Sequence, residues 1–261
     1  GSMGKWMMRN TSSIQMNYDI IDQRDLEEIM FIIDCTHPIS AYLFSNSPFY
    51  LGKSAGRKNI RNHIWENTDK TRCGSLIDHG IYDVNNLLDI YINRMMNAPG
   101  IFRLDDSLNI KESRFTLWDD LEKKWRKNTL TSNDIQAALH QIFTNVRLKT
   151  LIEIRDVDCL PYKYIMAPVA FLTGLIENRS YRGELISEFS SLTKQERKFW
   201  NQLALHLDID KGSIKNKKYI DWVKWIADIA IDGLEQRKLG EEKYFKNYYQ
   251  NIIDNGALSI Q

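Results

Sequence analysis

Two segments far apart in the chain alternate apolar and polar residues, which is the pattern of a strand with one buried face. In residues 12–19, Ile14 and Met16 fall on one face, whereas Gln15 and Asn17 fall on the other. The pattern predicts a strand that packs on one side and carries polar groups on the other. An ordinary antiparallel strand with one wet face produces the same alternation, so both interpretations stay open.

The second segment, residues 151–158, places Glu153 and Arg155 on the same face of a predicted strand. A carboxylate and a guanidinium held side by side on a rigid element suit a site for a metal, a phosphate or an amino acid. A structural salt bridge on a solvated face is the alternative that the spacing leaves open.

Apolar residues at helical spacing predict helices as well, and hence a mixed α and β chain. A helix over residues 25–33 follows a polar cap at Asp22. His37–Pro38 is expected to interrupt it, because proline disfavours the helical conformation of the residue before it. Residues 40–44 predict a second helical stretch, which ends in a turn at residues 45–48.

The remaining predicted helices follow the same periodicity and cover residues 84–95, 132–143, 168–177, 193–205, 219–236 and 241–251. The last four predict a helical layer packed behind the strands. Residues 52–74 are polar and lack periodicity, which is typical of a functional or disordered loop. Bulky residues in this stretch, such as Trp65, favour the functional loop.

Composition adds limits on partners and compartment. Of the 261 residues, 43% are hydrophobic and 26% charged, as in soluble globular proteins, and the net charge is +1. This balance provides no overall field for nucleic acid or a membrane surface, and no apolar run is long enough to span a membrane. Cys35, Cys73 and Cys159 lack zinc-ligand spacing. They predict reduced thiols and therefore a cytoplasmic protein without a leader segment.

Four motifs follow one another along the chain. They are WMMRNTSSIQMNYD at 6–19, LFSNSPF with a following Gly-Lys at 43–53, RNHIW with TDK and RCG at 61–74, and VRLKTLIEIRDVD at 146–158, which continues to APVAFLTGL at 167–175. In this order they resemble the glutamate-cysteine ligase family of the plant and proteobacterial type, in its C-terminal portion.

The resemblance implies an α+β fold like that of the glutamine-synthetase-like carboxylate-amine ligases, in which a curved, largely antiparallel sheet is backed by helices. It also implies an enzyme that uses ATP to activate the γ-carboxylate of glutamate as an acyl phosphate. An amine such as cysteine then attacks, as in γ-glutamylcysteine synthesis for glutathione. Mg²⁺ would accompany ATP, because it binds hard oxygen ligands and phosphates. Residues 3–261 are then expected to form one catalytic domain.

The resemblance implies two roles on the second strand. Glu153 falls on a glutamate that binds magnesium, and Arg155 falls on an arginine that stabilises the transferring phosphate. On the first strand, Gln15 and Asn17 fall near the metal and the nucleotide. These four residues would form the metal and phosphate side of the site.

Three more residues are implied on the substrate side. Arg61 falls on the arginine that holds the carboxylate of glutamate, a task that suits a bidentate guanidinium, with Asn46 and Trp65 beside the substrate. From the residues alone, a loop arginine is more often solvated and a tryptophan more often anchors a core.

Two departures from the family pattern leave three functions open. The family's chains extend upstream of Trp6, in a part that supplies further metal ligands, and Ile101 stands where plant members have a tyrosine near the cysteine acceptor. The chain is therefore expected to be a ligase, a half-enzyme completed by a partner chain or by self-association, or a non-catalytic regulatory remnant of the fold.

Overall fold

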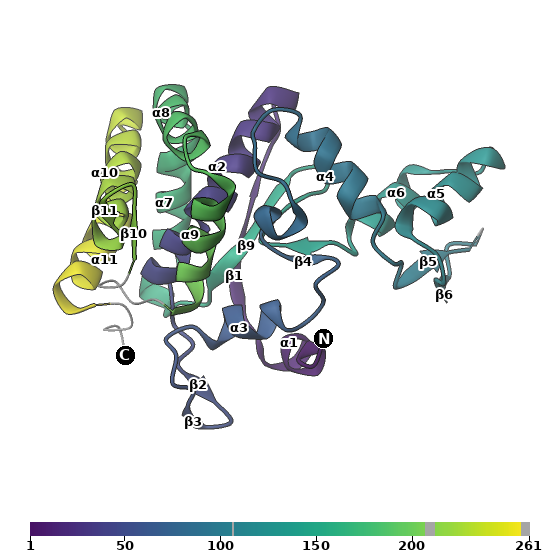
Figure 1. The fold of residues 1–261 in the computed structure, drawn as a ribbon, viewed down its shortest axis with the longest axis horizontal. Helices are drawn as coiled ribbons and strands as arrows, with labels where there is room; N and C mark the ends of the chain where they lie inside the picture. The colour runs from purple at the N-terminus through teal and green to yellow at the C-terminus, as the bar shows by residue number, and fades with distance from the viewer. Residues whose placement is uncertain (106, 207–211, 257–261) are drawn as a thin grey trace.

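Three antiparallel strands form the main sheet of the chain, for which the computed structural model describes residues 1–105, 107–206 and 212–256. Their order is β1, β9, β8, with bounds Ser13–Tyr18, Ile152–Asp158 and Val146–Leu148. Both segments predicted to be strands are confirmed, and they lie side by side although about 140 residues separate them (Figure 1).

The strand register aligns polar residues in one row across the sheet. Asn17 of β1 stands opposite Glu153 of β9, and Arg147 of β8 stands opposite Glu153 on its other side. The register shifts next to Gln15, which is the signature of a bulge. The row brings a carboxylate and a guanidinium from different strands into contact range, which neither strand determines alone.

Helix α2, Gln23–Leu43, lies between this sheet and the C-terminal helices (Figure 1). Its N-cap is Asp22, as expected, and the carboxylate accepts a hydrogen bond from the backbone of Asp25. The prediction that His37–Pro38 would interrupt the helix is wrong, since α2 continues through Pro38. A proline inside a helix costs about 3 kcal/mol. Residues on both sides of it are buried, and their packing outweighs that cost.

The C-terminal region forms a layer of helices, as predicted, with bounds α7 Ala167–Ile176, α8 Arg179–Ser190, α9 Lys194–His206, α10 Tyr219–Arg237 and α11 Glu242–Asn255. Helix α8 was not predicted, because few of its residues are apolar and buried. Helices α7 and α10 cross closely at Gly174. A Cβ atom there would lie 2.1 Å from the carbonyl oxygen of Ala230, so only glycine allows this approach.

The prediction of a loop over residues 52–74 is wrong. This stretch contains the strand β3 Lys53–Ser54, the helix α3 Ile60–Glu66 and the strand β4 Cys73–Gly74, and Asn59 caps α3. Helix α3 lacks an apolar stripe, because the residues it buries include Arg61 and Asn62. A helix that buries polar side chains is invisible to hydrophobic periodicity.

The remaining elements are short: α1 Gly4–Asn10, β2 Phe49–Tyr50, η1 Leu76–His79, α4 Leu87–Met96, β5 Phe102–Leu104, β6 Ile110–Glu112, α5 Leu117–Arg126, α6 Ser132–Leu139, β7 Phe143–Thr144, η2 Tyr162–Tyr164, β10 Ser213–Ile214 and β11 Lys217–Lys218. The sheets are small and antiparallel apart from the β4–β7 pair, so the mixed helix and strand class is confirmed. The curved sheet of glutamine-synthetase-like ligases stays a prediction.

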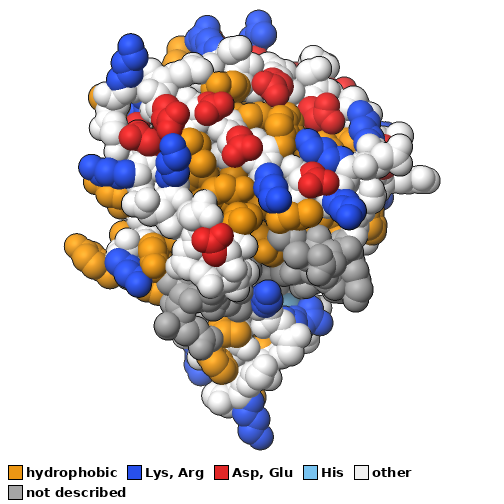
Figure 2. Space-filling view, turned by 90° about the vertical axis from the view of Figure 1, so that its left-hand side faces the viewer, with side chains coloured by type: hydrophobic (Ala, Val, Ile, Leu, Met, Phe, Trp, Pro, Cys, Tyr) orange, Lys and Arg blue, Asp and Glu red, His pale blue; other side chains and the backbone are white. Residues whose placement is uncertain are grey.

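Helices α10 and α11 lie at one end of the molecule, and β5, β6, α5 and α6 form the other (Figure 1). On the face shown in Figure 2, acidic and basic side chains are intermixed around apolar ones, in keeping with the balanced charge of the chain. Within the described ranges, no helix combines the length and the apolar character that crossing a membrane requires.

Candidate functional site

A buried carboxylate surrounded by cations lies at the middle of the sheet. Glu153 is 3% exposed, and its Oε1 accepts hydrogen bonds from Arg155 Nη1 at 2.6 Å and from Arg147 Nη2 at 2.9 Å. Lys149, which follows β8, forms a third ion pair with it. We call these four residues the Glu153 cluster. The structure therefore confirms that Glu153 and Arg155 share a face, and burial excludes a solvated salt bridge.

Sequence reasoning missed two members of the Glu153 cluster, Arg147 and Lys149. A signal was present, because residues 146–149 alternate apolar and basic side chains as a strand would. Finding them also required the register that places β8 next to β9.

The Glu153 cluster carries more positive than negative charge. Burial alone would raise the pKa of Glu153, but hydrogen bonds from Lys149 and Arg155 and the charge of Arg147 outweigh burial and lower this pKa to about 2. Burial and the neighbouring charge of Arg155 lower the pKa of Arg147. One ionised carboxylate among three cations leaves a local net charge of +2, which favours a second anion such as phosphate or carboxylate.

Aromatic rings hold the guanidinium groups in place. The Arg155 guanidinium lies 5.4 Å from the ring centroid of Trp65 and 5.6 Å from that of Phe143. Arg61 lies 5.8 Å from the same Trp65 ring, so Trp65 contacts two cations. The buried Nε1 of Trp65 has no hydrogen-bond partner among the described residues. Trp65 thus orients both arginines.

Arg61 is buried, which excludes the solvated loop arginine. Its Nη2 donates to the backbone oxygen of Arg155 at the bulge, and its Nε has no partner among the described residues. Burial lowers the pKa of Arg61, while the charges of Asp158 and Asp156 oppose this effect. Helix α3 and the bulge therefore place a second arginine beside Arg155, with part of its guanidinium unused.

Asn46 and Arg61 line one cavity of about 170 Å³, together with Asp158. The carboxylate Oδ2 of Asp158 accepts from the backbone N–H of Asn46 at 2.8 Å and from the hydroxyl of Ser47 at 2.7 Å. Burial raises the pKa of Asp158, and the charge of Arg61 opposes this rise. Two residues predicted on the substrate side are thus brought together, and Asp158, which was not predicted, joins them.

Gln15 and Asn17 lie at the exposed side of the Glu153 cluster on β1. Gln15 Oε1 accepts a hydrogen bond from Arg155 Nη1 at 3.3 Å, whereas Asn17 is placed beside Glu153 only by strand register. Gln15 is therefore part of the same hydrogen-bond network. Its role and that of Asn17 near metal and nucleotide stay predictions.

Magnesium is implied by the resemblance, and the residues present do not fit it by themselves. Across the part of the chain that the structure describes, no three His, Cys, Asp or Glu side chains converge as a metal-binding group. Glu153 already pairs with three cations, whereas Mg²⁺ needs several free oxygens in octahedral geometry. Glu153 as a magnesium ligand therefore stays a prediction.

The comparisons with known proteins identify the family of the chain. The model of the glutamate-cysteine ligase family 2 (GCS2) matches residues 1–260. The chain belongs to this family. Members of the family similar to it include a chloroplastic glutamate-cysteine ligase of Medicago truncatula, 28% identical over 264 residues, and glutamate-cysteine ligase A of Oryza sativa subsp. indica, 27% identical over 260 residues. Each alignment covers 98% of this chain but 50% and 52% of the relative.

The family match confirms the resemblance drawn from the four motifs and identifies the family as one of ligases. The chain spans about half the length of the curated relatives it matches. These relatives are named chloroplastic, which contradicts the prediction of a cytoplasmic protein. That prediction rested on free cysteines, which the structure does show at Cys35, Cys73 and Cys159. Free thiols indicate a reducing environment but do not distinguish one such compartment from another.

Proposed function

We propose that this chain carries the glutamate- and phosphate-binding part of a ligase that uses ATP to join the γ-carboxylate of glutamate to an amine, as in γ-glutamylcysteine synthesis. The observation that carries the proposal is the Glu153 cluster, where three cations and one carboxylate lie on a buried strand face. The names of the relatives, which are glutamate-cysteine ligases, support the same chemistry.

In the proposed reaction, an oxygen of the γ-carboxylate attacks the terminal phosphorus of ATP, so that ADP leaves and an acyl phosphate forms. The amine nitrogen then attacks the acyl carbon, the C–O bond to phosphate breaks, and the amine loses a proton as the amide forms. Phosphoryl transfer gathers negative charge on the phosphate oxygens, and positioned cations stabilise it. Arg155, Arg147 and Lys149 would supply these cations, and Arg155 is held by Glu153 and by the rings of Trp65 and Phe143.

Glutamate would bind in the cavity that Arg61 and Asn46 share. Arg61 lines this cavity and would pair with the α-carboxylate, and Asp158 places the opposite charge in the same cavity, which suits a zwitterionic amino acid. Magnesium would arrive with ATP. Gln15 and Asn17 would lie beside the nucleotide.

The amine acceptor is proposed only as an amino acid or related amine, with cysteine as the first candidate. Ile101 is half-exposed, and its backbone N–H donates to Gln141. Its hydrocarbon side chain has no polar group with which to bind an acceptor. The experiment must therefore compare several amines.

The chain should be incubated with ATP, MgCl₂, glutamate and a panel of amines that includes cysteine. ADP release and the γ-glutamyl product are measured separately, and an EDTA arm tests the need for magnesium. We expect product with at least one amine, and we expect Arg155→Lys to reduce kcat by a factor of about 100, since the guanidinium loses its fixed fork geometry.

A matched control is Arg182→Lys, because Arg182 forms a buried ion pair with Asp25 away from the site. It should lower stability while leaving kcat nearly unchanged. Absence of product and of ADP release with every amine would contradict turnover by this chain alone. If ATP and glutamate also failed to bind, the proposed function would be wrong and a non-catalytic role would take its place.

A further inference from the structure

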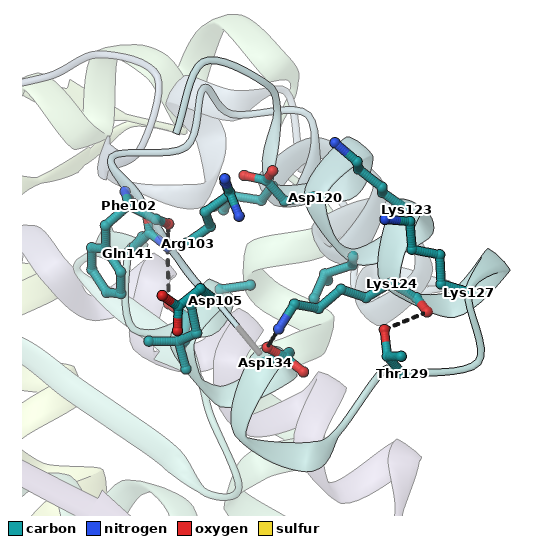
Figure 3. Close-up of a pocket in the computed structure, with 15 residues that line it drawn as sticks. Phe102, Arg103, Asp105, Asp120, Lys123, Lys124, Lys127, Thr129, Asp134 and Gln141 are labelled. Carbon is teal, nitrogen blue, oxygen red and sulfur yellow. Dashed lines mark hydrogen bonds and ion pairs between the residues drawn. The ribbon is translucent and has the colours of Figure 1, made fainter. Parts of the chain in front are cut away.

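A cavity of about 240 Å³ lies at the end of the molecule opposite the C-terminal helices, and none of the Glu153 cluster lines it (Figures 1 and 3). It is lined by β5, by α5 and the residues after it, and by α6. Its apolar wall includes Leu117, Leu121 and Ala138. Nothing in the proposed reaction uses this cavity.

Both signs of charge line the cavity, but the acidic side chains are already engaged (Figure 3). Asp134 pairs with Lys124 at 2.6 Å and accepts from the N-terminal turn of α6. Asp105 accepts backbone hydrogen bonds within its own turn. Asp120 accepts from the hydroxyl of Ser113. Asp134 and Asp105 therefore have little capacity left to bind a cationic ligand, whereas Asp120 has a single, neutral hydrogen-bond donor.

Basic side chains that line the cavity are, by contrast, largely unpaired among the described residues. Arg103 of β5 and Lys127 at the end of α5 line the cavity, and neither forms an ion pair or hydrogen bond through its side chain with any residue in the described ranges. Lys123 lies over the ring of Phe115, 5.7 Å from its centroid. Arg103 and Lys127 come from different elements, so an anion between them would join the hairpin to the helix.

We propose that this cavity binds a small organic anion whose apolar body packs against Leu117 and Leu121 and whose carboxylate or phosphate group pairs with Arg103 and Lys127. A six-carbon chain with one anionic group is of a size suited to the volume. Guanidinium and ammonium groups bind carboxylates and phosphates by charge-assisted hydrogen bonds, and the apolar wall adds the hydrophobic effect.

The cavity also has a direct structural connection to the Glu153 cluster. Gln141 forms part of its wall, accepting from the backbone N–H of Phe102 and donating to the Phe102 carbonyl. The carbonyls on either side, of His140 and Ile142, accept hydrogen bonds from Arg147. A ligand that contacts Gln141 would therefore touch the residue between His140 and Ile142, whose carbonyl groups accept hydrogen bonds from Arg147.

The test is a titration of the whole chain with hexanoate and with hexyl phosphate, followed by two-dimensional ¹H–¹⁵N NMR. We expect saturable shifts in residues 102–104 and 121–124, and tighter binding of either probe identifies which anionic group the site prefers. Arg103→Gln and Lys127→Gln should each weaken binding about 3- to 10-fold, since each removes one charge-assisted hydrogen bond. Because binding is read directly, the result does not depend on turnover.

Hexylamine provides the opposite charge on the same apolar body, and Lys198→Gln removes an exposed lysine elsewhere on the chain. Hexylamine should not produce the shifts. The Lys198→Gln variant should bind both anions as tightly as the unchanged protein does. Binding of hexylamine as tight as that of the anions would overturn the proposal. So would shifts confined to the Glu153 cluster, or Arg103→Gln and Lys127→Gln variants that both bind with unchanged affinity.

Discussion

Glu153 and Arg155 are two residues apart on β9, and their side chains meet at 2.6 Å on a strand that is buried along its whole length. Buried charges are stable only when their partners are in place. Arg147 and Lys149 complete the pairing of Glu153 from β8 and the turn after it.

Arg147→Leu should destabilise the protein by about 3 kcal/mol, because it removes a buried partner of Glu153 and leaves the carbonyls of His140 and Ile142 without their donor. Urea unfolding followed by circular dichroism measures the free energy of unfolding. Arg126→Leu is the control, since Arg126 forms an exposed pair with Glu122, and it should change stability by no more than about 0.5 kcal/mol. Equal effects of the two substitutions on the free energy of unfolding would show that the Glu153 cluster stabilises the protein no more than an exposed ion pair does.

Stability should fall in acid because of Glu153. Its pKa is lowered to about 2 in the folded protein, below the ordinary 4.5, so the folded state binds fewer protons than the unfolded state between these values. The stabilisation is therefore complete above about pH 4.5 and is lost as the pH falls toward 2, with a size on the order of 3 kcal/mol. Urea midpoints at pH 3 and pH 6 should differ less for Glu153→Gln than for the unchanged protein. An identical pH dependence of the unchanged protein and of Glu153→Gln would contradict a lowered pKa of Glu153.

Gly174→Ala should destabilise the protein by about 2 kcal/mol or more. Its added Cβ atom would lie 2.1 Å from the carbonyl oxygen of Ala230, so helices α7 and α10 must move apart. Gly183→Ala in α8 is a matched control with the opposite expected sign. Apart from its own helical turn, no atom of the described residues lies within 4 Å of its added Cβ, and alanine favours the helix by up to about 1 kcal/mol. Thermal unfolding of both variants checks the pair, and a harmless Gly174→Ala would refute the close crossing.

Arg61→Lys should raise the KM for glutamate more than tenfold while the KM for ATP changes little, if the proposed function holds. Lysine keeps the charge but loses the planar fork that both holds the Arg155 carbonyl and reaches the cavity. Steady-state kinetics with each substrate varied separately make the comparison. Arg179→Lys, on the exposed start of α8, serves as the control and should alter neither constant. A change in the KM for ATP alone would indicate that Arg61 binds ATP and not glutamate.

The sequence was enough to predict both strands, most helices and the shared face of Glu153 and Arg155. Periodicity reveals such features because the direction of a side chain within one element depends only on local backbone geometry. It failed at α3, which buries Arg61 and Asn62 instead of an apolar stripe, and at Pro38, where packing overrides a local preference.

Local patterns in the chain were therefore sufficient for most of its helices and strands, for its family and for the pairing of groups two residues apart. Tertiary structure alone decided that Arg147 and Lys149 join Glu153, that Gln15 reaches Arg155 across the bulge, and that Arg61 and Asn46 share a cavity with Asp158. These contacts join residues from different elements, and strand register and helix packing set their distances. Neither register nor packing can be predicted from the local pattern of any one segment.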